Sequence, residues 1–333
     1  MKAMRFQADL LTGRLSERDA RRYFSRFGWF AFIFTALSGV AVSTIGRIVY
    51  NFSAQIYSHW LFGKLISLIA FYAVALPIAL IPLLRLPRIT PERAKMPHAH
   101  WWQGLSICIT LMMLGNYVSS IILTLIESYA GIETKNPVSE AIEKAPLWGT
   151  FVFIVIVSPI IEEIVFRKIL CNRLLALGER YAVILSAACF ALVHGNLYQL
   201  FYAFTLGCFF SFVYVKTGKL RYTVLYHMAM NFICGFLSPI IHEKANIEGL
   251  AENFVINAET VLPLVAYVCF DVLIMGAAAA GAIFVFQKRR NFYLHEGLIP
   301  PPEDQAIECI FRSSGIIAAL ILFAIILSAS IIS

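Results

Sequence analysis

The sequence predicts an all-α fold, a polytopic transmembrane helical bundle of about eight or nine helices with a cytoplasmic N-terminus. The 333 residues are 59% hydrophobic and only 14% charged, whereas soluble domains average about 25% charged residues. Apolar stretches long enough to cross a hydrocarbon layer of ~30 Å as helices recur along nearly the whole chain. Basic residues alternate from one side of these stretches to the other, as in membrane proteins of defined orientation.

Nine apolar segments are candidate spans. They run approximately over 28–46, 65–84, 104–126, 147–166, 181–195, 198–215, 222–241, 260–286 and 314–332. The charged stretch before the first segment has no cleavage pattern after it, so we interpret that segment as an anchor and not as a signal peptide. We expect a basic cytoplasmic N-terminal segment (1–27), one membrane bundle (28–286), a polar cytoplasmic connection (287–313) and a C-terminal transmembrane helix (314–333).

Lys and Arg concentrate on one predicted side of the membrane. That side, made of residues 1–27, 85–100, 167–180, 216–221 and 287–313, holds 22 of the 27 basic residues. The opposite side holds the acidic loops 127–143 and 243–259. The excess of basic residues places the N-terminus in the cytoplasm and, with nine spans, the C-terminus outside. We expect an integral protein of the plasma (cell inner) membrane whose net charge of +7 faces anionic lipid, with the bilayer and no nucleic acid as a partner.

Ionisable side chains inside membrane helices are functional candidates, because each costs about 2.5–3.5 kcal/mol at the helix centre. The positions that qualify are Glu162, Glu163, His194, His227 and Asp271, with the uncharged Asn231 and Asn116. Asp271 stands deep in the eighth segment without a motif around it, so we expect a structural hydrogen bond to another helix there. Asn116 has the same interpretation, as an interhelical contact.

The fourth segment ends with two neighbouring acids that face different directions. Glu163 and Arg167 are four residues apart and therefore share a helix face, where they can pair. Glu162 lies about 100° around the helix and stays available for another role.

Two further segments carry a histidine on a polar stripe. Phe190 and His194 share a face at the end of the fifth segment, and Gly195 after them permits a bend. His227 and Asn231 share a face in the seventh segment by the same spacing.

A carboxylate and two imidazoles in an apolar cavity can activate water in two ways. Glu162 can take a proton from water as a general base, without a cofactor. Alternatively, Glu162, His194 and His227 can bind one divalent metal, zinc first, which acidifies the water. In both cases the amide of Asn231 can donate to the oxyanion of a tetrahedral intermediate.

The ordered set Glu-Glu-x-x-x-Arg, Phe-x-x-x-His and His-x-x-x-Asn, within a core at about 145–241, resembles the CAAX-protease and bacteriocin-processing family of intramembrane endopeptidases. This family includes the type II CAAX prenyl proteases. The resemblance implies that Glu162 activates the water, that His194 and His227 position it or bind metal, and that Asn231 completes the oxyanion site. It also implies a supporting role for Glu163 and Arg167. The expected activity is glutamic or metallo-endopeptidase cleavage of a membrane-associated or prenylated, CAAX-type protein or peptide.

Depth along the helices gives one difficulty. Glu162 precedes Arg167 by five residues and His227 follows Arg221 by six, so both are expected about 8–9 Å inside the cytoplasmic boundary. His194 would lie about 21 Å from Arg180. A hairpin around Gly178 that projects below the membrane would bring Glu162 and His194 to one level. Residues 195–215 would then be too short to reach the far side and return, so we expect that the fifth and sixth helices do not span fully.

Other functions fit parts of the pattern. Glu162 and Glu163 can belong to a solvated helix end where Arg167 and Lys168 neutralise them. His194 or His227 can make a purely structural hydrogen bond to another helix. As whole-protein alternatives we consider a proton-coupled transporter and a non-catalytic membrane regulator or scaffold. Proton-coupled transporters usually contain paired repeats with broken helices, which are not evident here.

Overall fold

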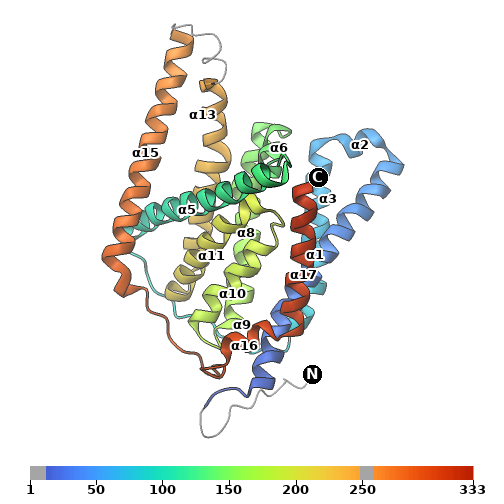
Figure 1. Cartoon of the computed structure of the whole chain (residues 1–333), viewed down its shortest axis with the longest axis vertical. Coiled ribbons are helices and arrows are strands. Elements are labelled where there is room, and N and C mark those ends of the chain that lie inside the picture. Colours follow the sequence, from blue (N-terminus) through green and yellow to red (C-terminus); the bar gives the residue numbers. More distant parts are fainter. Residues whose placement is uncertain (1–12, 248–257, 333) are drawn as a thin grey trace.

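The computed structural model describes residues 13–247 and 258–332, and most of this chain is helix (Figure 1). Of the described residues, 81% are helical. Within the described residues there is no β-strand, and an isolated bridge pairs Gly178 with Glu296. The predicted all-α class is confirmed.

Eight helical stretches of the described chain are long and apolar enough to cross a membrane. They are Glu17–Phe52, Trp60–Leu83, His98–Ala130, Leu147–Leu174, Leu197–Thr217, Leu220–Ala245, Thr260–Asn291 and Ser314–Ile331. The remaining candidate, 181–195, corresponds to α10 (Glu179–Leu192), whose 14 residues extend only about 21 Å. The protein is therefore an integral membrane protein in which the fifth predicted segment is too short to span.

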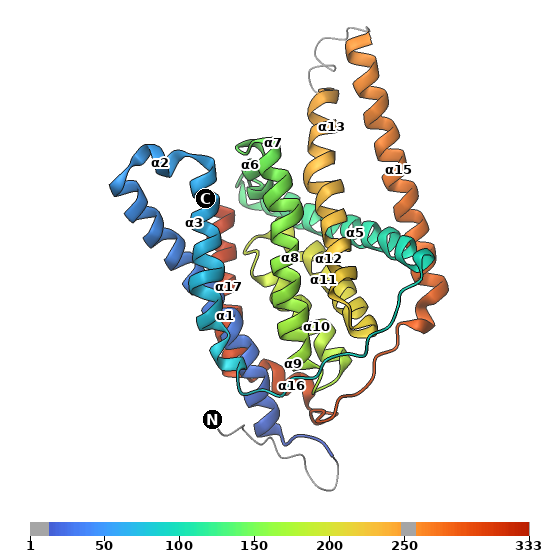
Figure 2. The ribbon, with the colours of Figure 1, turned by 180° about the vertical axis from the view of Figure 1, so that it is seen from behind.

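On one side of the bundle, helices from the beginning and the end of the chain pack together (Figure 2). Helix α1 (Glu17–Phe52) rises to the short α2 (Ala54–Ser58), and the chain returns through α3 (Trp60–Leu68), η1 (Ile69–Ala75), α4 (Leu76–Ala79) and η2 (Ile81–Leu83). After the short α16 (Ala306–Phe311), helix α17 (Ser314–Ile332) packs along α1. A Cβ atom at Gly28 would overlap the backbone of Gly315, so the two glycines permit this close approach.

The centre of the bundle contains the three motif-bearing segments. A continuous helix comprises α7 (Leu147–Gly149), η3 (Thr150–Val157), α8 (Ser158–Glu163), η4 (Ile164–Cys171) and α9 (Asn172–Leu174). Helix α10 and α11 (Leu197–Thr217) form an antiparallel hairpin, followed by α12 (Leu220–Met230), η5 (Asn231–Leu237) and α13 (Ser238–Ala245). Gly195 adopts a φ of 66° in the turn of the hairpin, which is the predicted bend and a conformation that glycine tolerates best.

The third part of the bundle crosses the others. Helix α5 (His98–Ala130) runs obliquely across α11 and is followed by the short α6 (Pro137–Glu143). Helix α15 (Ala258–Lys288), which continues into η6 (Arg289–Asn291), packs on α5 and α13 (Figures 1 and 2). Asp271 on α15 lies 3.7 Å from the imidazole of His242 on α13, which is near another helix but longer than the hydrogen bond that was predicted. The interpretation of Asn116 is wrong, because this side chain is exposed. Ser119 makes the interhelical bond one turn later, to the Leu197 carbonyl at 2.9 Å.

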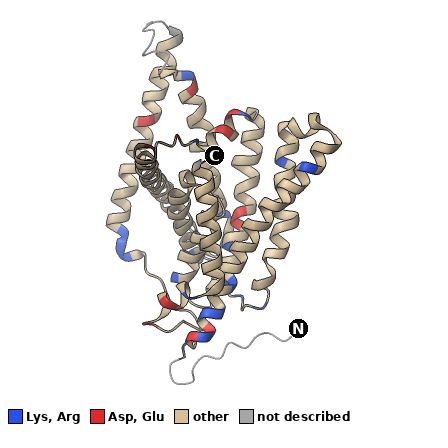
Figure 3. Ribbon diagram, turned by 45° about the vertical axis from the view of Figure 1, so that its right-hand side comes forward, with Lys and Arg blue, Asp and Glu red and all other residues tan. Residues whose placement is uncertain are grey.

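Lys and Arg gather at the end of the molecule where the N-terminus lies (Figure 3). The polar connection crosses this end and is held by backbone hydrogen bonds from Ile299 to Ala176 and from Leu15 to Pro300, at 2.9 and 2.8 Å. Part of the predicted acidic loop, residues 248–257, lies outside the described residues.

Candidate active site

Glu162 and Glu163 lie at the end of α8 and point to different surroundings. The side chain of Glu162 is 18% exposed and accepts a hydrogen bond from Ser158 Oγ at 2.6 Å. The side chain of Glu163 is completely buried. Adjacent carboxylates on one helix thus have distinct environments, as their angular separation predicted.

The predicted ion pair between Glu163 and Arg167 is present inside the bundle. Arg167 Nε lies 3.1 Å from Glu163 Oε2, and both side chains are 0% exposed. The guanidinium also lies over the rings of Phe190 and Phe210, at 4.9 and 5.7 Å from their centroids, where cation–π attraction stabilises a desolvated charge. The alternative interpretation, in which Glu162 and Glu163 form a solvated helix end, is therefore wrong.

His227 connects the two carboxylates. Its Nδ1 lies 3.1 Å from Glu163 Oε1, and its Nε2 lies 3.7 Å from Glu162 Oε2. Because a carboxylate oxygen accepts hydrogen bonds, the Nδ1 atom carries the proton, and in the neutral ring Nε2 presents a lone pair toward Glu162. Glu163 therefore sets both the orientation and the tautomer of His227.

His194 follows α10 directly, and its orientation is set in a similar way. Nδ1 donates to the carbonyl of Phe190 at 2.7 Å, so the neutral ring again carries its lone pair on Nε2. The ring also meets Phe190 edge to face at 4.9 Å between centroids. The predicted shared face of Phe190 and His194 is confirmed.

The predicted difficulty about depth arose from the place assigned to Arg167. That residue does not mark a membrane boundary, because it is fully buried and its helix continues to Leu174. Glu162 lies twelve residues before Leu174, where this span ends, which is about 18 Å along the helix. His194 lies fifteen residues after Glu179, where α10 begins, which is about 22 Å. Similar distances along these antiparallel helices agree with the position of Glu162 and His194 in the lining of one cavity.

Asn231 makes a contact that a proline explains. The π-helical hydrogen bonding of η3 joins the Ser158 N–H to the carbonyl five residues earlier, at Phe153. The next bond in that pattern would come from residue 159, but Pro159 has no N–H, which leaves the Ile154 carbonyl without its helical donor. Asn231 Nδ2 donates to this carbonyl at 2.9 Å. The second N–H of the same amide remains for another acceptor.

A cavity of about 320 Å³ opens beside Glu162. His194, Ser158 and Gln199 line it on one side, and residues of α3 and η1 line it on the other. Among the latter, Tyr72 lies against Ser158 and Glu162. Sequence reasoning missed Ser158, although its position one turn before Glu162 was a usable signal.

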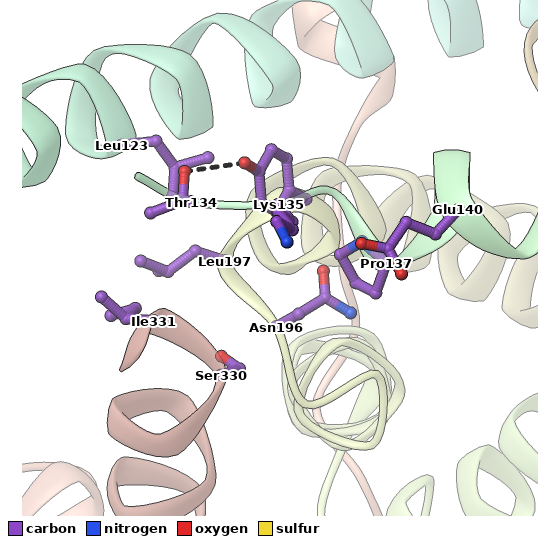
Figure 4. Close-up of a pocket in the computed structure, with 10 residues that line it drawn as sticks. Leu123, Thr134, Lys135, Pro137, Glu140, Asn196, Leu197, Ser330 and Ile331 are labelled. Carbon is purple, nitrogen blue, oxygen red and sulfur yellow. Dashed lines mark hydrogen bonds between the residues drawn. The ribbon is translucent and has the colours of Figure 1, made fainter. Parts of the chain in front are cut away.

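A second hollow, of about 200 Å³, lies between the loop after α5, the start of α11 and the end of α17 (Figure 4). It contains none of the predicted catalytic side chains. Its wall includes Asn196, which caps α11 through the Gln199 N–H and donates to the His194 carbonyl, at 2.9 and 2.8 Å. The hollow therefore borders the turn that carries His194, whereas Glu162 and the His194 side chain line the other cavity.

The predicted metal set was tested against the positions of its donor atoms. In the part of the chain that the structure describes, no three His, Cys, Asp or Glu side chains are close enough together to hold a metal ion. Glu162, His194 and His227 therefore do not form a metal site in this arrangement.

Fold and site together define a class of protein, a polytopic membrane protein that holds a cluster of carboxylate and imidazole groups inside its helical bundle. Residues 144–233 match the family model described as type II CAAX prenyl endopeptidase Rce1-like. The chain is 31% identical over 194 residues to the membrane-embedded CAAX protease MroQ of Staphylococcus aureus (strain USA300), covering 56% of this chain and 76% of MroQ. It is 27% identical over 174 residues to CAAX prenyl protease 2 of Arabidopsis thaliana, covering 40% of this chain and 54% of that protein. No solved structure shows a significant match.

The chain belongs to the Rce1-like CAAX endopeptidase family. This membership supports a membrane endopeptidase activity.

Proposed function

We propose that the protein is an intramembrane endopeptidase in which Glu162 is the general base. The observation that carries this proposal is the position of Glu162 Oε2, 3.7 Å from the Nε2 atom of a histidine whose other nitrogen is held by Glu163. Two hydrogen-bond acceptors at this separation can share one water molecule between them. The second carboxylate is neutralised by Arg167, so only Glu162 is available to take up a proton.

In the proposed reaction, the water donates one hydrogen bond to Glu162 and one to His227. As the water oxygen attacks the scissile carbonyl carbon, its proton passes to Glu162 and the carbonyl oxygen becomes an oxyanion. The remaining N–H of Asn231 stabilises this oxyanion, an interaction typically worth about 3–4 kcal/mol. The C–N bond then breaks as Glu162 returns the proton to the leaving amine, and the second water proton leaves with the new carboxyl group. His194 borders the same cavity and helps to hold water and substrate.

The proposed substrate is a membrane-associated protein or peptide of the prenylated CAAX type. The names of the two relatives support this class, and a cavity within an apolar bundle suits a substrate that is itself anchored in lipid. We further propose that the protein resides in the plasma membrane, with the site accessible from the cytoplasmic side. The concentration of basic residues at the N-terminal end supports this orientation (Figure 3).

The Glu162→Gln variant tests the proposal. Glutamine keeps the size of the side chain and can still accept from Ser158, but it cannot take up the proton. Cleavage of a farnesylated CAAX-type peptide by the purified variant in liposomes should fall about 10²- to 10⁴-fold. The matched control is Glu143→Gln on α6, outside the cavity, which should retain wild-type activity. Undiminished cleavage by the Glu162→Gln protein would reject the assignment, and absence of cleavage by wild type would favour a non-catalytic regulator.

A further inference from the structure

Lys64 lines the same cavity as Glu162. It belongs to a stripe of α3 and η1 with residues 64, 67, 68, 71 and 72, all of which line the cavity. These positions follow the helical spacing i, i+3, i+4, i+7 and i+8, so they form one continuous face. Lys64 is the one cation and Glu162 the one carboxylate of the described lining.

The ammonium group of Lys64 has no partner among the described residues. No ion pair or hydrogen bond to them involves this side chain, which is half-buried in the second membrane span. Lysines near helix ends commonly extend toward the membrane surface to stay hydrated. Lys64 instead borders a cavity walled by Phe71, Leu68 and Phe153, where an unpaired charge is costly and favours an anionic ligand.

The spacing along the stripe defines the length of such a ligand. Tyr72 at one end lies against Glu162, and eight residues separate it from Lys64, which is roughly 10–12 Å along a helix. An extended peptide covers about 3.3–3.6 Å per residue. About three residues therefore fit between a carbonyl attacked at Glu162 and an anionic group at Lys64.

We propose that Lys64 binds the terminal carboxylate of the peptide substrate. A free C-terminus would enter the cavity and pass Glu162 toward α3, and the ion pair with Lys64 would fix which peptide bond meets the activated water. The α-carboxylate is the anion that every unmodified peptide carries, and Ser67 beside Lys64 supplies a hydroxyl that can donate to it. This inference rests on the proposed endopeptidase function and assigns a specificity-determining residue within it.

The experiment compares two forms of one farnesylated, fluorescence-quenched CAAX-type peptide, with a free carboxylate or a carboxamide at the C-terminus. The proteins are wild type, Lys64→Met, Lys64→Arg and the control Lys144→Met, each in liposomes. Lys144 is a solvent-exposed lysine paired with Glu140 on the surface, so its replacement tests a general effect of losing one charge. Peptide binding is also measured by fluorescence anisotropy with Glu162→Gln and Glu162→Gln/Lys64→Met, in which cleavage does not interfere.

Wild type should prefer the carboxylate in kcat/KM by roughly tenfold to hundredfold, as expected for one charge-assisted hydrogen bond. Lys64→Met should reduce this preference to about one, mainly through KM, whereas Lys64→Arg and Lys144→Met should preserve it. Binding to the Glu162→Gln protein should show the same preference, and the Lys64→Met change should remove it.

Two results would overturn the role of Lys64. One is equal treatment of both peptides by wild type, and the other is an equal loss for both peptides in Lys64→Met. If wild type cleaves neither peptide but Lys64-dependent carboxylate binding persists, the proposed endopeptidase function fails while the binding role of Lys64 stands.

Discussion

Replacing Arg167 by methionine would remove the positive charge from a completely buried ion pair. Glu163 would keep the neutral polar partners His227, at 3.1 Å, and Thr223, but no cation, and its own side chain is 0% exposed. Loss of one partner from a buried pair typically costs about 3–5 kcal/mol, because an uncompensated charge remains inside the protein. We expect the folded-to-unfolded ratio to fall about 10²- to 10³-fold or more, since each 1.4 kcal/mol changes an equilibrium tenfold.

The chain contains a matched control for this change. Glu308 and Arg312 have the same residue types in the same order and spacing, with 2.6 Å between Arg312 Nη1 and Glu308 Oε1, but their side chains are 45% and 63% exposed. Exposed pairs contribute about 0–1 kcal/mol. Arg312→Met should therefore change the free energy of unfolding by less than 1 kcal/mol.

Equilibrium unfolding in mixed micelles of mild detergent and sodium dodecyl sulfate, followed by tryptophan fluorescence and circular dichroism, measures both variants. The double variant Glu163→Gln/Arg167→Met should regain much of the lost stability, because it removes both buried charges and glutamine can still accept from His227. Equal costs for Arg167→Met and Arg312→Met would refute the reasoning. A double variant that loses the sum of its single effects would refute it as well.

Three further changes test the site and the bundle. Ser158→Ala should lower kcat about tenfold to hundredfold with KM little changed, because it removes the hydrogen bond that orients Glu162; an unchanged kcat contradicts this role. Dialysis against a chelator should leave peptide cleavage intact, because the mechanism proposed here uses no metal; a loss that zinc restores would show that a metal takes part. Gly28→Leu should destabilise the bundle by more than about 2 kcal/mol in the same unfolding assay, because the side chain would meet the Gly315 backbone. Gly39→Leu, with open space around it, is the control and should be nearly neutral.

Short-range relations in the site were predictable from the sequence. The Glu163–Arg167 pair and the Phe190–His194 contact both join residues four apart, and helix geometry alone brings such residues together. The divergence of Glu162 from Glu163 has the same origin. Each of these relations depends on one helix and needs no knowledge of its neighbours.

Relations between helices were harder to predict. Arg167 counts as a basic residue at a loop when charges are assigned along the chain, and its burial depends on Phe190 and Phe210 from two other helices. Asn116 and Ser119 are both polar residues of α5, and only the position of α11 decides which of them makes a contact. Lys64 carries no motif, and its relation to Glu162 depends on how α3 packs against the central helices.

The missing N–H of Pro159 determines the relative height of two neighbouring helices. An unpaired carbonyl in an apolar environment costs about 1–3 kcal/mol. The Asn231 amide at the start of η5 satisfies Ile154 in η3 only at one position of the α12–η5 helix along the η3–α8 helix. A shift of α12 by one turn would break this link and also move His227 about 5.4 Å away from the level of Glu162. Proline is usually regarded as a residue that interrupts a helix. Here Pro159 fixes the register of two helices, because its missing N–H favours the alignment in which Glu162 and the His227 imidazole lie at the same level.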